Sequence, residues 1–177
     1  MSKVLQAEKE GYQVLKLIGE VRLSHSPSIS SYLSRIRKLK DFRGMLVDLS
    51  ETTSIDSTAL GLIAKLAICC RETFNHTLSI VSPREDIRRL LLSMSMHEVS
   101  LISSEPLKAS TALEELPREV ASEEVLLKQV LEAHEILMSL DAENESRFKD
   151  LVEDLEKEQL DRTALAARTV QFEKSLA

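Results

Sequence analysis

The sequence has few of the residues that build cofactor or nucleic-acid sites. It has no tryptophan and only 3% aromatic residues, so stacking platforms for single-stranded nucleic acid are not expected. Its four glycines form no phosphate-cradling loop. The two cysteines, Cys69 and Cys70, are adjacent and cannot build a disulfide framework, which suggests a reducing compartment. No cluster of histidines and cysteines completes a metal site, so we expect neither a metal nor a cofactor.

Long apolar runs are also missing. No stretch approaches the roughly 20 apolar residues that are needed to span a bilayer. The N-terminal residues lack the apolar core of a signal peptide. We therefore expect a cytoplasmic protein that makes no use of a membrane.

Charge is distributed unevenly along the 177 residues. Residues 1–104 contain 14 Lys and Arg against 11 Asp and Glu, a net charge of +3, whereas residues 105–177 contain 9 against 18, a net charge of −9. The acidic second part argues against nucleic-acid binding. It is either a solvated helix surface or an acidic interaction surface.

The first part of the chain alternates between strand and helix patterns after an initial hairpin. The strands are expected at residues 4–8, 12–18, 45–49, 77–81 and 99–102, and the helices at 29–39, 57–72 and 83–94. This order predicts an α/β fold in which a mixed sheet is covered mainly on one face by helices.

The remainder of the chain reads as helical. We divide the sequence into a domain at 1–104, a linker or short helix at 105–117, and a helical extension at 118–177. The extension contains either two helices or one long interrupted helix, with an apolar stripe that includes His134. Such helices cannot bury their stripes alone, so they pack back on the domain, form a homodimer, or recruit another protein.

Residues 45–62 are the most informative stretch, because a buried strand leads there into an Asp-Ser-Thr sequence at the start of a helix. This order places the Ser57 hydroxyl at a helix N-terminus, where free N–H groups and the helix dipole would stabilise a phosphate. Serine and aspartate are also common N-caps, so Ser57 and Asp56 fit a purely structural role as well. The two roles are compatible.

The same stretch resembles the phosphorylated loop of STAS domains, the family of bacterial anti-sigma factor antagonists. In that family an Asp-Ser-Ser/Thr-Gly-Leu-Gly motif follows a buried strand, and the serine after the aspartate is the phosphorylation site. The matching positions here are Asp56, Ser57, Thr58, Leu60 and Gly61. Ala59 replaces the first glycine, a change that favours the helix.

The resemblance implies a STAS-like fold and a function in partner switching. The unphosphorylated domain would bind an anti-sigma factor or a serine kinase, phosphorylation of Ser57 would break that complex, and a serine phosphatase would restore it. The residues expected to contact the partner are Asp56, Ser57, Thr58, Ala59, Leu60, Asp48 and Ser24. We thus expect an anti-sigma factor antagonist with a helical extension that dimerises the protein, or masks or extends its binding surface.

Two other functions fit the sequence less well. A STAS module could act as a structural or sensory scaffold in a larger signalling complex, or regulate another effector such as a diguanylate cyclase. A hydrolase triad could use Ser57 as its nucleophile. Its other members would come from His25, His76, Asp48 and Asp56. Because no Gly-x-Ser-x-Gly elbow is present, we expect no enzymatic activity.

Overall fold

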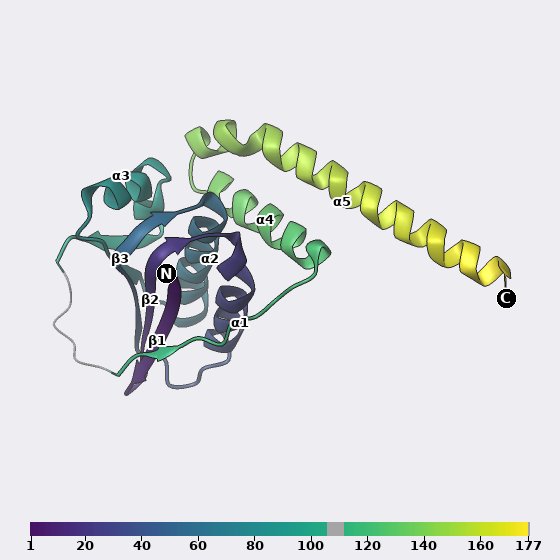
Figure 1. The fold of residues 1–177 in the computed structure, drawn as a ribbon. Coiled ribbons are helices and arrows are strands. Elements are labelled where there is room, and N and C mark those ends of the chain that lie inside the picture. Colours follow the sequence, from purple (N-terminus) through teal and green to yellow (C-terminus); the bar gives the residue numbers. More distant parts are fainter. Residues whose placement is uncertain (106–111, 177) are drawn as a thin grey trace.

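The computed structural model, which describes residues 1–105 and 112–176, has a six-stranded mixed sheet at its centre (Figure 1). The strands are β1 (Lys3–Lys9), β2 (Tyr12–Val21), β3 (Gly44–Ile55), β4 (Leu78–Val81), β5 (Ser100–Ser103) and β6 (Glu114–Glu115). Their order in the sheet is β5-β4-β3-β2-β1-β6. Strands β2 to β5 are parallel neighbours, whereas β1 pairs in the antiparallel sense with β2 and with β6.

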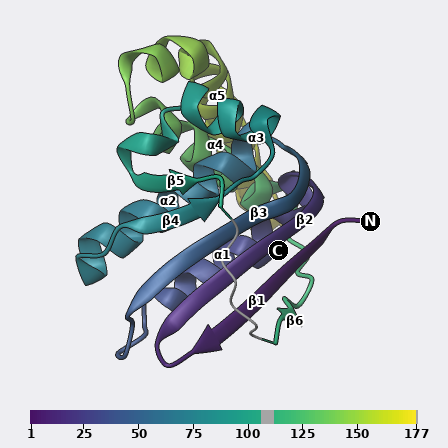
Figure 2. The same cartoon turned by 90° about the vertical axis from the view of Figure 1, so that its left-hand side faces the viewer.

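Helices cover one face of this sheet and leave the strands β1, β2 and β3 in full view from the other side (Figure 2). The helical elements are η1 (Leu23–His25), α1 (Ser26–Ile36), α2 (Ser57–Phe74), α3 (Glu85–Ser93), η2 (Met96–Glu98), α4 (Glu123–Met138) and α5 (Ala142–Leu176). Each parallel connection moves one strand along in the same direction, and right-handed crossovers then place α1, α2 and α3 on one side. The predicted fold class, including the helical extension, is confirmed.

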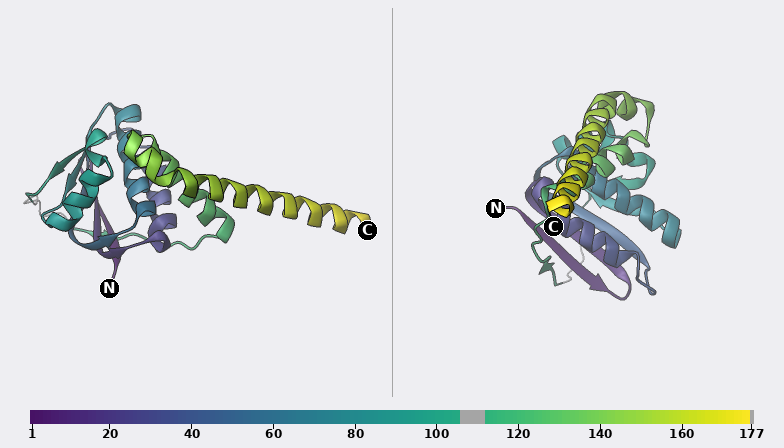
Figure 3. Two further views of the ribbon diagram at one scale, coloured as in Figure 1. Left: turned by 90° about the horizontal axis from the view of Figure 1, so that it is seen from above. Right: turned by 90° about the vertical axis from the view of Figure 1, so that its right-hand side faces the viewer.

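The extension wraps around the domain before it leaves it. Among the described residues of the predicted linker, Glu114–Glu115 form strand β6 and none is helical. Residues 106–111 of that linker lie outside the described residues. Helix α4 then lies against α2, and α5 pairs with α4 before its C-terminal half extends away from the body (Figure 3).

Hydrogen bonds fix both ends of α4. On the N-terminal side, the Ser28 hydroxyl donates to the Pro117 carbonyl at 2.9 Å and accepts from the Glu119 N–H at 3.0 Å. On the C-terminal side, the Asn144 amide donates to the carbonyls of Met94 and Leu137, each at 2.9 Å. The α4–α5 turn is therefore attached to the end of α3.

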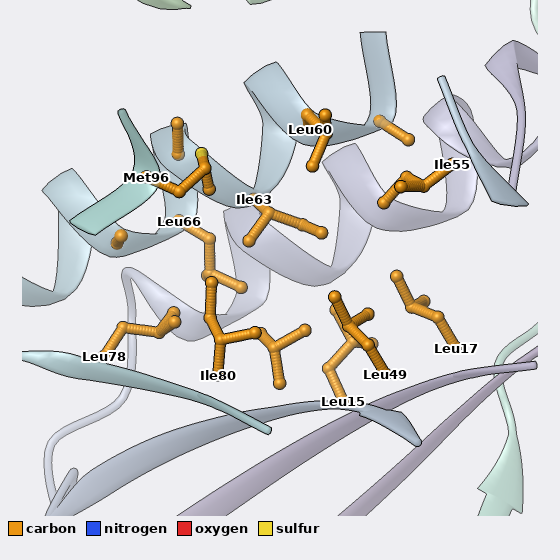
Figure 4. Close-up of a cluster of buried hydrophobic side chains, with 14 of the residues drawn as sticks. Leu15, Leu17, Leu49, Ile55, Leu60, Ile63, Leu66, Leu78, Ile80 and Met96 are labelled. Carbon is orange, nitrogen blue, oxygen red and sulfur yellow. The ribbon is translucent and has the colours of Figure 1, made fainter. Parts of the chain in front are cut away.

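The core lies between the sheet and α2 (Figure 4). Alternate residues of the strands point into it, as the two-residue period of a strand requires. These strand residues, all fully buried, include Leu15, Leu17, Leu49, Leu78 and Ile80, and they meet Leu60, Ile63 and Leu66 of α2. Most residues of α2 are buried, on more than one side of the helix, because the sheet covers one side and α4 covers another.

Strand β3 is longer than the sequence predicts. The expected strand ended at Leu49, but β3 continues to Ile55 and pairs with β2 along its whole length. The polar residues 50–54 indicate a turn in the sequence; in the structure they belong to β3, where Ser50 and Glu51 both contact Lys16 and Thr52 is fully buried. Two register shifts in the β2–β3 pairing, beside Lys16 and Gly19, accommodate the extra length.

Across the residues that the structure describes, no helix combines the length and the apolar character needed to cross a bilayer.

The β1–β2 hairpin requires an unusual backbone conformation in its turn, and a substitution there tests this requirement. Glu10 and Gly11 both have positive φ, at 52° and 86°, and a Cβ on Gly11 would lie 2.1 Å from the Asp41 carbonyl oxygen. We expect Gly11→Ala to lower the free energy of unfolding by roughly 1–3 kcal/mol. Glu10→Gly is the control, and we expect it to change stability by less than about 1 kcal/mol because glycine adopts positive φ freely. Urea unfolding followed by circular dichroism measures both, and equal effects would contradict this account.

Candidate functional site

Asp56 organises the junction between β3 and α2. It is the N-cap of α2, with an extended backbone (φ −86°, ψ 166°). One carboxylate oxygen accepts from the Ala59 N–H at 2.8 Å, and the other accepts from the Leu23 N–H at 2.7 Å. The same side chain therefore starts the helix and holds η1, with its exposed Ser24, beside the helix N-terminus.

Ser57 is the first residue of α2, and its hydroxyl contacts the tail. Its Oγ lies 2.8 Å from Nε2 of His134 in α4. The Nδ1 of His134 lies 2.7 Å from the Val130 carbonyl oxygen, which can only accept, so Nδ1 carries the proton. In the neutral imidazole Nε2 is then the acceptor, and the Ser57 hydroxyl donates to it.

The imidazole of His134 is held rigidly in this position. It is 2% exposed, and its ring packs edge-on against Phe148 of α5, with 5.0 Å between the ring centroids. A buried imidazole nitrogen without a partner is costly, so the hydrogen bond from Ser57 stabilises the seated position of α4.

Three residues of α2 face α4 along one stripe. We call Ser57, Gly61 and Lys65 the Ser57 stripe, because their spacing of four residues places them on one side of the helix. A Cβ on Gly61 would lie 2.3 Å from the Ala133 carbonyl oxygen, so only glycine permits this approach. Lys65 forms an ion pair with Glu132 at 2.7 Å. Helix α4 therefore covers this side of α2 closely.

Several residues that we expected to contact a partner are not on the surface. Thr58, Ala59 and Leu60 are buried, the last two within the core cluster, because the first turn of α2 points them inward. A partner cannot touch them in this conformation.

The structure does not bring Asp48 to Ser57. Asp48 lies inside β3 on the open face of the sheet, where it forms an ion pair with Lys16 at 3.3 Å and accepts from the Ser50 N–H at 2.8 Å. Asp48 pairs with Lys16 of β2 and Ile55 pairs with Val21, so the two positions lie about 17 Å apart along the sheet. The family resemblance grouped Asp48 with Ser57 as a partner contact; the structure instead places Asp48 within β3, away from the β3–α2 junction.

Sequence reasoning also missed His134 as the partner of Ser57. It was assigned to the apolar stripe of the tail helix without a role of its own. A histidine inside such a stripe is a signal in itself, because a buried ring nitrogen must find a hydrogen-bond partner. Its partner 77 residues earlier in the chain follows only from the packing of α4 on α2.

The Ser57–His134 pair has part of the geometry of a hydrolase, but it does not have the surroundings. A carbonyl, not a carboxylate, orients the imidazole. Four cavities formed by the described residues are lined by other side chains, and not by Ser57 or His134. The other two histidines that we considered have other partners: His76 Nε2 accepts from the Met45 N–H, and His25 Nδ1 accepts from the Arg22 N–H.

Within residues 1–105 and 112–176, no three His, Cys, Asp or Glu side chains gather into a group that could hold a metal ion.

The cap at Asp56 can be tested by two substitutions. Asp56→Ala removes both acceptors, and we expect it to lower the free energy of unfolding by about 1–3 kcal/mol. Asp56→Asn keeps one acceptor oxygen and should cost roughly half as much. Chemical unfolding of both variants checks this order, and an Asn variant as unstable as the Ala variant would show that charge matters more than the two hydrogen bonds.

The comparison with known protein families agrees with this geometry. The model of the STAS domain matches residues 4–112, which is more than half of the chain and includes the β3–α2 junction. A search of curated proteins found no match. The chain belongs to the STAS domain family.

Proposed function

We propose that this protein is a bacterial, cytoplasmic protein-binding regulator of the anti-sigma factor antagonist type, switched by phosphorylation of Ser57. The observation that carries the proposal is the position of Ser57. It is the first residue of the 18-residue helix α2, directly after the N-cap Asp56, within the part of the chain that matches the STAS family. A helix N-terminus stabilises a phosphate, so the modification suits the first turn of α2.

The switch acts through charge. A phosphate adds about two negative charges at neutral pH. These charges would join the carboxylate of Asp56 at the surface where η1 and α2 meet. A partner with an apolar or acidic surface binds the unmodified form and is repelled by the phosphorylated form. By family analogy the partner is an anti-sigma factor or a serine kinase, and a serine phosphatase reverses the modification.

The first test examines the protein from its native cells. Intact-mass analysis and peptide mapping should find one phosphate, located on Ser57, and Ser57→Ala should abolish it. Tagged Ser57→Ala should also retain the co-purifying partner, whereas Ser57→Asp should lose most of it because the carboxylate brings part of the phosphate charge.

Ser34→Asp is the matched control, since it adds the same charge at an exposed position of α1. We expect it to retain the partner. If the three variants capture the same proteins in the same amounts, or if phosphate is found only at other residues, the proposed switch is wrong.

The C-terminal part of α5 favours a second candidate, a scaffold that assembles through its tail. Residues 161–175 are exposed on all sides, and Arg162 makes the last ion pair with α4, to Glu123 at 3.3 Å. Leu165 and Phe172 are 66% and 65% exposed, an unusual state for such side chains. An isolated helix of this length is marginal in water, so pairing with a second copy would stabilise it.

Light scattering tests this candidate. We expect the full chain to have the mass of a dimer, and the double variant Leu165→Glu/Phe172→Glu to have the mass of a monomer, because two charges would be buried in the contact. The control Gln159→Glu/Gln171→Glu adds the same charge to polar positions of α5 and should remain dimeric. A monomeric parent would eliminate pairing of the tails as the function of this segment.

A further inference from the structure

Helix α4 occupies the surface of the STAS domain that the proposed function requires. Every residue of the Ser57 stripe has a partner on α4: Ser57 meets His134, Gly61 meets Ala133, and Lys65 meets Glu132. Ala133 is fully buried, and so is Leu137 one turn later. The contact combines a hydrogen bond, a close backbone approach and an ion pair, so α4 is seated in one defined position.

A seated α4 leaves no room for a phosphate on Ser57. The distance of 2.8 Å between Ser57 Oγ and His134 Nε2 is that of a direct hydrogen bond, so a phosphorus atom with three oxygens cannot lie between them. The imidazole cannot turn aside either, because Phe148 packs against it and Val130 holds its other nitrogen. Ser57 is half-buried as a residue, and its hydroxyl, directed into the α2–α4 contact, is not presented to a kinase in this arrangement.

We propose that α4 is an intramolecular gate over the Ser57 stripe. With α4 seated, neither a modifying enzyme nor a partner reaches Ser57; with α4 lifted, both do. The identity of the excluded proteins rests on the proposed function, but the gate itself does not. It follows only from the contact between α4 and α2.

The rest of the tail keeps a lifted α4 close to its seat. The hydrogen bonds of Ser28 to the segment that precedes α4 do not involve the Ser57 stripe. They can stay in place while the contact with α2 opens. Reseating is then an intramolecular event at high effective concentration, so the gate closes again when nothing occupies the stripe.

The test measures access to position 57 in the full chain. Ser57→Cys places a thiol there, and its rate of reaction with an aromatic disulfide reagent reports the fraction of molecules with α4 lifted. The native cysteines give a low background, since Cys69 and Cys70 are 3% and 0% exposed and burial raises the pKa of Cys70 to about 12. We expect Ser57→Cys to react slowly, and far more slowly than a cysteine at the exposed Ser24.

A second substitution on α4 should open the gate. Ala133→Glu places a carboxylate against Gly61, and we expect the labelling rate of the Ser57→Cys chain to rise at least about tenfold, equivalent to about 1.4 kcal/mol in the opening equilibrium. Glu135→Ala, at an exposed position of the same helix, is the control and should leave the rate unchanged. Ala133→Glu with Ser57 intact should still protect the native cysteines, which shows that the domain remains folded.

A substitution in α2 tests the same contact without changing the sequence of α4. Gly61→Ala adds one methyl group to α2, where alanine is the better helix former, yet its Cβ collides with Ala133. It should also accelerate labelling. Labelling rates within about twofold of the Ser57→Cys chain in both variants, or rapid labelling of Ser57→Cys alone, would overturn the gate.

The gate and the proposed function fail in different ways. In native cells, Ala133→Glu should raise the phosphorylated fraction of Ser57. Faster labelling without any phosphate at Ser57 would support the gate and contradict the phosphorylation switch. Phosphate at Ser57 with unchanged labelling would support the switch and contradict the gate.

Discussion

Helix α2 must be covered on two sides, and the architecture follows from that constraint. Its apolar residues run around most of the helix, so the sheet alone cannot bury them. Helix α4 supplies the second cover, and the missing side chain of Gly61 lets the two backbones approach closely enough to exclude water. The tail is therefore a structural layer of the molecule. Because α2 begins at Ser57, this requirement for cover also places the tail over the residue that we propose as the switch.

The sequence was sufficient for the parts of the fold that depend on local patterns. The alternation of strands and helices, the start of α2 and the position of Ser57 at its N-terminus all follow from hydrophobic periodicity and cap chemistry within a few residues. The full length of β3 did not follow from these patterns, because polar residues near the end of a strand look the same in sequence as a polar turn. His134 could be assigned to a helix but not to Ser57, since no local rule states which side of α4 meets which side of α2.

The acidic character of the tail has a local meaning in the structure. Several carboxylates contact the domain: Glu132 meets Lys65 of the Ser57 stripe, Glu115 forms an ion pair with Lys3, and Asp141 accepts from the Ser95 hydroxyl. Many others lie on the exposed surface of α5, where residues 153, 154, 156 and 158 are solvated. The solvated-surface interpretation of the charge thus describes these residues, whereas at the contact with α2 a single ion pair supplements apolar packing. Such a pair contributes to orientation more than to the strength of the contact.

The edges of the sheet show how the molecule avoids an unwanted form of association. An exposed strand edge presents unpaired N–H and carbonyl groups that can template the pairing of another chain. Strand β6 occupies part of the outer edge of β1, where the Leu116 N–H also donates to the Val4 carbonyl at 2.8 Å. The opposite edge is β5, which has only four residues. Strand β6 thus covers part of one edge of the sheet, and the other edge is short. Both features limit edge-to-edge pairing with another chain, even though one face of the sheet carries no helix.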